Sequence, residues 1–435
     1  MSFRTKAPLL AVTALVSAFG FASTAYADAF YLQAQSARGA GRAFSGEAAD
    51  TGAASLWWNP AAIAGIRDGS ATLSASAIIP RGDVVDTGSQ ICRPGGQPCT
   101  AISGQSNSSD PVNKGVVPSG AVAYPLTDRI AVGLVVTSPF SFTTNYDADS
   151  WARYSADKTR LRTIDIQPSI GVELTDWLRV GGALNVEYTD AILSNALPNV
   201  SAAQPDGRQE LSGDGWDLGW TAGVQLHNDF ATVGVTYKSS IRHKLKGDLV
   251  VTGLLGPLAG GNTEVSGATA EFNTPGQVIV AGRVRATDQL TLNAQVIAFN
   301  WSKFDTIDLG APLNTAIPEN YMDSWSLAGG FDYDVTPKLT VRAGVQRTKS
   351  PTQDGSRDAR VPDADRWTYA AGGSYQLSSH IALDAGAQYV DFANTTIDRI
   401  TAAYVGTAAQ TNILTSGALR NASAVVLSLG GRVTF

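Results

Sequence analysis

Apolar and polar residues alternate with a period of two along much of the chain after residue 69. Between residues 178 and 189, leucine, valine and tyrosine occupy one set of positions, and arginine, asparagine and glutamate occupy the other. This alternation is typical of β-strands whose two faces meet different environments. The runs are about ten residues or longer, which exceeds the five or six residues common in soluble strands and fits tilted strands that cross a membrane.

Short polar turns recur in one layout along the same region. Examples are Leu126–Ile130, Leu174–Leu178, Ala286–Leu290 and Leu377–Ile381, each of which ends on an aliphatic residue that opens the next alternating run. One such turn, two strands and one longer polar loop form a repeating unit. The pattern predicts fourteen strands, near residues 69–80, 117–126, 129–144, 158–174, 177–192, 213–226, 229–246, 271–286, 288–304, 321–334, 337–349, 365–376, 379–392 and 422–435.

The alternation of short turns with long loops predicts the fold class. It is typical of outer-membrane barrels, in which closure leaves no strand edge without a hydrogen-bonding partner. We therefore expect an all-β fold, a fourteen-stranded antiparallel transmembrane β-barrel over residues 69–435. The last strand alternates up to the terminal Phe435, and such an aromatic end is the usual signal to the outer-membrane assembly machinery. A soluble edge strand is the alternative interpretation of this segment.

The N-terminus predicts export. Residues 1–27 have a basic start at Arg4 and Lys6, an apolar centre and a small-x-small end, as in a secretory signal peptide. A buried N-terminal helix is the alternative. Export exposes the chain to an oxidising compartment, so Cys92 and Cys99, seven positions apart, are expected to form a local disulfide. Together with the strand pattern, the expected export predicts that the protein resides in the outer membrane of a Gram-negative bacterium.

Composition narrows the classes of function. Lys and Arg number 32 against 38 Asp and Glu, so a nucleic-acid partner is not expected. The mean hydropathy of −0.02 argues against a bundle of membrane helices. The three histidines, His227, His243 and His380, lack convincing acidic partners by spacing. We therefore expect no metal, no cofactor and no enzymatic activity.

Residues 28–68 do not follow the strand pattern. They are rich in Ala, Gly and Ser, yet they carry large apolar residues that include Phe30, Leu32 and Trp57. Asn59 and Pro60 suit the start of a short helix. The segment could be a flexible periplasmic tail. However, a barrel of this size has a lumen wider than its side chains fill, so we expect residues 28–68 to form a hatch that plugs it.

Several motifs resemble those of the long-chain fatty-acid transporter family, FadL and its aromatic-hydrocarbon relatives such as TodX. They are Ala29–Gln33, Gly39–Glu47, Asn59-Pro60-Ala61, the strand pair 117–140 and Asp363–Tyr369. The resemblance implies a monomeric barrel with an N-terminal hatch, which takes up long-chain fatty acids or aromatic hydrocarbons without an energy source. It also implies landing loops at 194–212 and 247–270 and lateral exit into the outer-membrane lipid at a kink in the third strand.

Physical reasoning supports lateral exit, because re-exposing apolar surface in a polar lumen costs roughly 25 cal/mol per Å². Pro139 lacks a ladder N–H and could interrupt the third strand, or simply end it. The apolar run at 249–258 could bind ligand or pack as an ordinary loop. Charged residues such as Arg160, Arg162 and Arg342 are expected to line the lumen. A general diffusion porin is the alternative function. The candidate ligand contacts are Phe30, Leu32, Pro139, Phe140, Phe142, Leu249, Val251, Leu254, Leu255 and Leu258.

Overall fold

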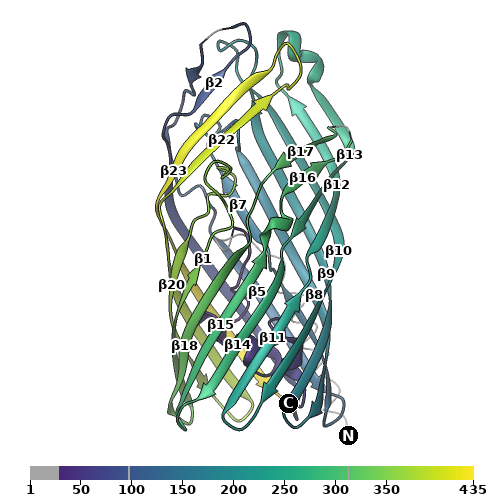
Figure 1. The fold of residues 1–435 in the computed structure, drawn as a ribbon, viewed down its shortest axis with the longest axis vertical. Helices are drawn as coiled ribbons and strands as arrows, with labels where there is room; N and C mark the ends of the chain where they lie inside the picture. The colour runs from purple at the N-terminus through teal and green to yellow at the C-terminus, as the bar shows by residue number, and fades with distance from the viewer. Residues whose placement is uncertain (1–28, 97, 312) are drawn as a thin grey trace.

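A closed antiparallel β-barrel forms the wall of the molecule (Figure 1). The computed structural model describes residues 29–96, 98–311 and 313–435, so the expected signal peptide, residues 1–27, lies outside the described residues. The barrel closes where the first strand, β1, pairs with the last, β23, from Ser70 opposite Thr434 to Asp86 opposite Gly417. The prediction of a fourteen-stranded barrel is confirmed.

Several of the fourteen wall strands are interrupted, so that two named strands share one position in the wall. The wall consists of β1 (Ser70–Asp86), β5 (Gly115–Pro125), β6 (Ile130–Thr137) with β7 (Ser141–Asn145), β8 (Lys158–Thr175), β9 (Leu178–Leu197), β10 (Gly207–His227), β11 (Ala231–Lys238) with β12 (Ile241–Thr252), β13 (Thr263–Thr274) with β14 (Gly276–Arg285), β15 (Leu290–Asn300), β18 (Ser324–Thr336), β19 (Leu339–Thr348), β20 (Arg366–Gln376), β21 (Ile381–Phe392) and β23 (Thr411–Thr434).

The strands differ from their predicted ranges mainly at the end of the barrel far from the chain termini. There β9, β10, β12 and β13 continue as paired strands through most of 194–212 and 247–270, so the prediction of loops over these residues is wrong. The alternation persists through these segments because inward residues of the extended wall still pack on buried neighbours. Only 198–206 and 253–262 lie between the strands, and the latter contains the 3₁₀ helix η5 (Gly256–Gly261).

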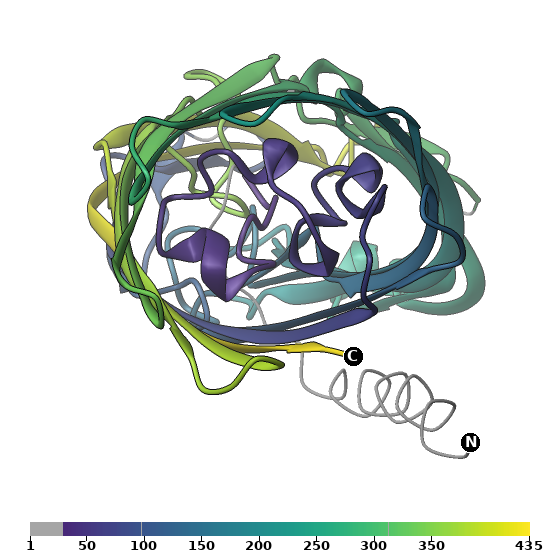
Figure 2. The ribbon, with the colours of Figure 1, turned by 90° about the horizontal axis from the view of Figure 1, so that it is seen from below.

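Residues 29–68 lie inside the ring of strands, as the view along the barrel in Figure 2 shows. The segment folds into short turns of helix that bury its small residues against the wall. These are α2 (Ala37–Ala40), η2 (Glu47–Ala49), η3 (Ala53–Ser55) and η4 (Pro60–Ile63). We call residues 29–68 the hatch. None of the helices in the described ranges is long and apolar enough to cross a membrane.

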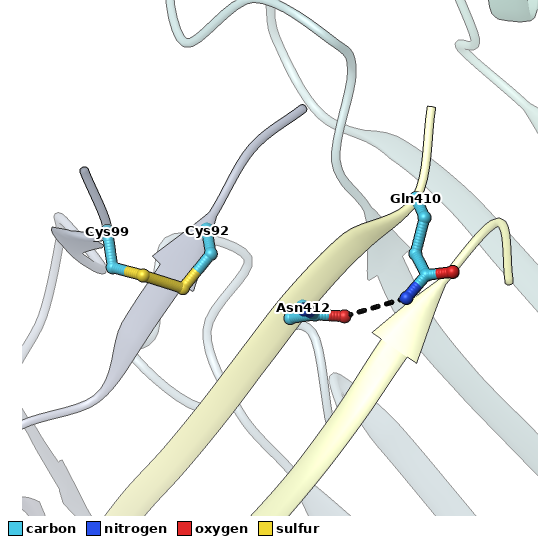
Figure 3. The surroundings of a disulfide bond; sticks show 4 residues. All are labelled: Cys92, Cys99, Gln410 and Asn412. Carbon is cyan, nitrogen blue, oxygen red and sulfur yellow. Dashed lines mark hydrogen bonds between the residues drawn. A yellow bond between two sulfur atoms is a disulfide. The ribbon is translucent and has the colours of Figure 1, made fainter. Parts of the chain in front are cut away.

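Short elements extend the wall beyond the membrane-spanning part. They are β2 (Gln90–Cys92), β3 (Thr100–Ala101), β4 (Asn107–Ser109), η6 (Trp301–Lys303), β16 (Thr306–Leu309), β17 (Thr315–Pro318) and β22 (Thr395–Ala403). Cys92 and Cys99 form the expected disulfide. Figure 3 shows it beside β23, where Gln410 donates to Asn412 at 3.1 Å. The disulfide therefore closes a loop that pairs with β23 through β2.

Aromatic side chains on the outer face mark two levels of the wall. Near the short turns, Trp177 and Phe230 are 56% and 61% exposed. Towards the other end, Trp216 and Trp220 are similarly exposed, and Trp220 contacts the Tyr237 ring at 5.1 Å between centroids. Two such belts flank the apolar band of outer-membrane barrels. The seven-residue rise from Phe230 to Tyr237 covers about 24 Å of strand, or roughly 18 Å along the axis of a barrel with strands tilted by about 40°, which is most of the height of that band.

Candidate functional site

An apolar pocket lies between the hatch residue Phe30 and one side of the barrel wall. It encloses about 720 Å³ of space between its atoms, part of which is open to solvent. Alternate inward positions of neighbouring strands supply the walls, because successive residues of a strand point to opposite faces. The apolar lining consists of Phe30, Phe142, Leu161, Ala191, Leu193, Leu211, Leu245, Ala268, Ala270, Phe272, Phe304, Ile307 and Val361.

Phe30 connects the pocket to the hatch through a cluster of rings. Its centroid lies 5.7 Å from Phe142, 4.8 Å from Trp301 and 5.1 Å from Phe304. Phe30 is buried, and contacts of this geometry between aromatic rings add to the energy of burial. The hatch therefore contributes one wall of the pocket, and a displacement of the segment around Phe30 would change the shape of the pocket.

Two charged residues from outer loops also line the pocket. Arg360 lies between β19 and β20, and its guanidinium reaches across to Thr159 Oγ1 at 3.3 Å and Asn195 Oδ1 at 3.4 Å. Its nearest carboxylate is that of Asp358, at 3.9 Å. These are long contacts, so the Arg360 guanidinium keeps capacity for a shorter, charge-assisted hydrogen bond with a ligand carboxylate.

Glu319 is the acidic residue of the pocket. It is 6% exposed, and Arg399 Nη1 lies 3.8 Å from its Oε2. Arg399 itself is held more closely by Asp358, at 2.8 Å. Burial raises the pKa of Glu319 to about 7, against the opposing effect of Arg399. Asp358 behaves differently: burial favours its neutral form, but Arg399 and Arg360 hold the pKa of its carboxyl below the ordinary value.

The third position in the wall is interrupted next to the pocket, between the end of β6 at Thr137 and the start of β7 at Ser141. β6 pairs with β5 only over Gly120–Pro125. The outer part of β5, Gly115–Ser119, pairs with β1 on one edge, but within the described residues no ladder joins its other edge to β6 or β7. Pro139 lies in the interruption, where a residue without an N–H fits.

The hatch supplies the hydrogen bonds that the wall lacks at this interruption. Leu32 N donates to Pro139 O at 2.7 Å, and Ser141 N donates to Phe30 O at 2.9 Å. Gln35 Nε2 donates to Ser138 O at 2.7 Å. The gap in the wall is therefore closed from the inside by a segment that belongs to the hatch, and the same segment carries the pocket residue Phe30.

A buried ion-pair network fixes the hatch to the opposite wall. Arg42, with a side chain 1% exposed, contacts Glu47 Oε1 at 2.6 Å, Asp50 Oδ2 at 2.6 Å and the wall residue Asp332 at 2.9 Å. Arg283, also in the wall, lies 3.0 Å from both aspartates. Buried charges require such pairing, so the charged side chains of the hatch and those of the wall neutralise one another.

Asn59 ties a second point of the hatch to the wall. Its Oδ1 accepts from Ala61 N at 2.9 Å at the start of η4, and its Nδ2 donates to Ala48 O at 2.8 Å and Val224 O at 3.2 Å. The wall approaches closely here: a Cβ at Gly223 would lie 1.9 Å from Asn59 Oδ1. Glycine at this position therefore lets the hatch pack against the strand.

The predicted ligand contacts lie in different places. Phe30 and Phe142 line the apolar pocket. Pro139 and Phe140 line a separate small cavity near the hatch, and Leu32 lines another. Leu249, Val251 and Leu254 are buried between the extended strands, whereas Leu255 is 38% exposed. Leu258 packs partly buried against the core.

Arg360 and Glu319 were not predicted from the sequence, and two arginines expected in the lumen lie on the other face of their strand. Arg360 and Glu319 occur in polar loops without periodic signal, so only the fold brings them together. Arg160 and Arg162 do not project into the lumen, although Arg160 contributes to the lining of the pocket. Their neighbours Thr159 and Leu161 are the buried, inward residues, so the two arginines project from the outer face of β8. Alternation distinguishes two faces but does not identify which is outward when both are partly polar.

These features define a class of protein: an outer-membrane barrel with a plugged lumen, an internal apolar pocket and an interrupted wall. The profile of the family described as outer membrane protein transport protein (OMPP1/FadL/TodX) matches residues 18–435. The chain therefore belongs to this family, and it is an outer-membrane protein.

Sequence relatives agree with the family, and solved structures agree with the fold. The 47 kDa outer membrane protein of Pasteurella multocida is 29% identical over 401 residues, covering 86% of this chain and 90% of the relative. The long-chain fatty acid transport protein of Escherichia coli K12 is 26% identical, covering 89% and 92%. A Pseudomonas aeruginosa FadL homologue superposes with a TM-score of 0.81 at 24% identity, covering 93% and 99%. The Pseudomonas putida toluene transporter TodX superposes at 0.62 with 14% identity, covering 93% and 99%.

Proposed function

We propose that this protein is a passive outer-membrane channel for hydrophobic molecules, and that a long-chain fatty acid is the ligand its pocket fits best. The observation that carries this proposal is the combination of an apolar pocket with the Arg360 guanidinium at its edge. Each buried methylene group contributes about 0.8 kcal/mol, and a hydrogen bond to a charged group contributes about 1.5–3 kcal/mol. A fatty acid gains from both the burial of its acyl chain and the hydrogen bond to its carboxylate, whereas an aromatic hydrocarbon gains only from burial.

The interrupted wall supports lateral exit of the ligand. The pocket and the gap between β5 and β7 share the segment Phe30–Leu32, which lines one and closes the other. A ligand that displaces this segment would reach the bilayer without crossing the polar half of the lumen. Membrane lipid is then the acceptor, and the favourable transfer of apolar surface supplies the driving force.

The hatch argues for a selective channel over a general diffusion porin. A porin needs an open, water-filled lumen, whereas here buried ion pairs and close packing at Gly223 hold residues 29–68 across it. The relatives whose names state an activity are transporters. We infer that this chain is likewise a transporter without enzymatic activity, that it works as a monomer, and that Phe435 directs its assembly.

Ligand binding by purified protein in a neutral detergent tests the proposal. We expect Arg360→Gln to weaken the binding of oleate about tenfold, because one charge-assisted hydrogen bond is lost. Binding of oleyl alcohol, which has the same chain and no charge, should stay the same. Arg347→Gln, an arginine on the outer face of β19 paired with Asp365 at 2.8 Å, serves as the control. An equal loss of affinity for oleate and for oleyl alcohol in Arg360→Gln would show that Arg360 only supports the structure of the pocket.

A further inference from the structure

A row of three cations on the outer wall lies outside the lining of the apolar pocket. Arg242, Lys244 and Lys246 of β12 are exposed, and the residues between them point inward and are buried. Residues two apart on a strand project to the same side about 7 Å from one another. The three side chains therefore form a basic row along the outside of the barrel, which we call the basic row.

The basic row lies just beyond the outer aromatic belt. β12 continues the strand of β11 after Ser240, so Arg242 is five residues beyond the belt residue Tyr237, and Figure 1 shows β12 above β11. Five residues of strand cover about 17 Å, or roughly 13 Å along the axis of a barrel with strands tilted by about 40°. Aromatic belts lie at the boundary of the hydrocarbon. The row is therefore level with the headgroups of the outer leaflet.

Two of the three cations form no ion pair within the described residues. Arg242 pairs with Glu271 of β13. In contrast, within the part of the chain that the structure describes, no carboxylate forms an ion pair with Lys244 or Lys246, although Glu271 of β13 faces Lys244 and Asp214 of β10 faces Lys246 across the ladders. These two ammonium groups, neighbours along one face of β12, therefore remain available to an anion from outside the chain.

Further cations extend the surface sideways along the same level. Arg160 and Arg162 project from the outer face of β8, where both share the single carboxylate of Asp190, at 2.7 and 3.9 Å. The ladders place Arg162 opposite Asp190 and Asp190 opposite Asp214, which faces Lys246. The two arginines and the basic row thus belong to one continuous stretch of wall.

We propose that the basic row binds the phosphate groups of a phosphorylated lipid in the outer leaflet. Lysine and arginine donate charge-assisted hydrogen bonds to phosphate oxygens, and each basic residue near an anionic membrane surface contributes about 1 kcal/mol of attraction. Acyl chains of the same lipid can pack on the exposed Trp216 and Leu218, which lie beside the row on the neighbouring strand β10. The lipid is thereby held beside the wall at a defined place, independently of the transport pocket.

Native mass spectrometry in a neutral detergent tests this proposal, with diphosphoryl lipid A as the probe. We expect the double variant Lys244→Gln/Lys246→Gln to bind one lipid A fewer, or to need about tenfold more of it for the same occupancy. The control Lys338→Gln/Arg285→Gln removes two exposed cations at the end of the barrel with the short turns and should bind lipid A like the wild type. Both variants should retain the heat-dependent gel mobility of a folded barrel.

Two further arms identify what the basic row recognises. Inorganic phosphate at millimolar concentration should fail to displace lipid A, because the acyl contacts are missing; full displacement would mean that the row binds phosphate alone and would overturn the lipid assignment. Higher salt should weaken binding to the wild type more than to the lysine variant. If the lysine variant binds as much lipid A as the wild type at every concentration, the proposal is wrong.

Discussion

Removal of the Arg42 guanidinium should release the hatch. Arg42→Met keeps most of the side-chain volume but leaves Glu47, Asp50 and Asp332 without their shared cation, which now lies 2.6–2.9 Å from each. Breaking a buried ion pair by removing one partner costs about 3–5 kcal/mol. Arg283 still neutralises part of the charge, so we expect a cost at the lower end of this range, about 3 kcal/mol. A loss of this size raises the population of the open hatch roughly a hundredfold.

Two measurements report this opening. Single-channel recordings in planar bilayers should show frequent open events with Arg42→Met, and amide hydrogen exchange should be faster in residues 37–63 than in the wall strands. Arg67→Met is the matched control. Its side chain is 65% exposed and pairs with Asp128, which is 93% exposed, so its loss should cost less than about 1 kcal/mol. Conductance and exchange equal to the wild type in Arg42→Met would refute the view that this network holds the hatch.

Three other changes test different parts of the molecule. Pro139→Val should favour regular pairing at the interruption and slow uptake of fatty acid by cells, with unchanged ligand binding; uptake at the wild-type rate would argue against lateral exit. Since burial raises the pKa of Glu319 to about 7, oleate affinity should fall as the pH rises through 7, when this carboxyl becomes anionic beside the ligand; Glu319→Gln should abolish the pH dependence, and a persistent one would exclude Glu319 as its source. Cys99→Ser should cost about 2–3 kcal/mol of loop closure and speed cleavage by proteinase K near residues 90–105, whereas equal cleavage rates would show that pairing with β23 alone holds the loop.

The barrel could be predicted from the sequence because its signal is local. Alternation and short turns recur along the chain, and each repeat shows the same pattern of one apolar face and one polar face. The same signal failed beyond the membrane, where Leu249 and Val251 still alternate but belong to strands that extend the wall. Nothing in a single segment tells a strand in lipid from its continuation above it.

The site could be predicted only in part because it depends on contacts between distant segments. Phe30 and Phe142 could be predicted because both are large apolar residues. Phe30 lies in the segment expected to form the hatch, and Phe142 lies near the expected kink in the third strand. Arg360 reaches the pocket from a polar loop, and its hydrogen bonds join it to residues more than 160 positions away. Such a contact follows from the closed wall and the loop path together, and no local spacing indicates it.

Photo-crosslinking tests the central claim most directly. A fatty acid with a diazirine at the end of its chain would be bound to purified protein, irradiated and located by peptide mass spectrometry. We expect labels on the inward residues of the pocket, such as Leu161, Leu245 and Phe272, and we expect these labels to disappear when unlabelled oleate competes for the pocket. Labels confined to outer-face residues such as Trp216 or Leu218, with no effect of oleate, would contradict it.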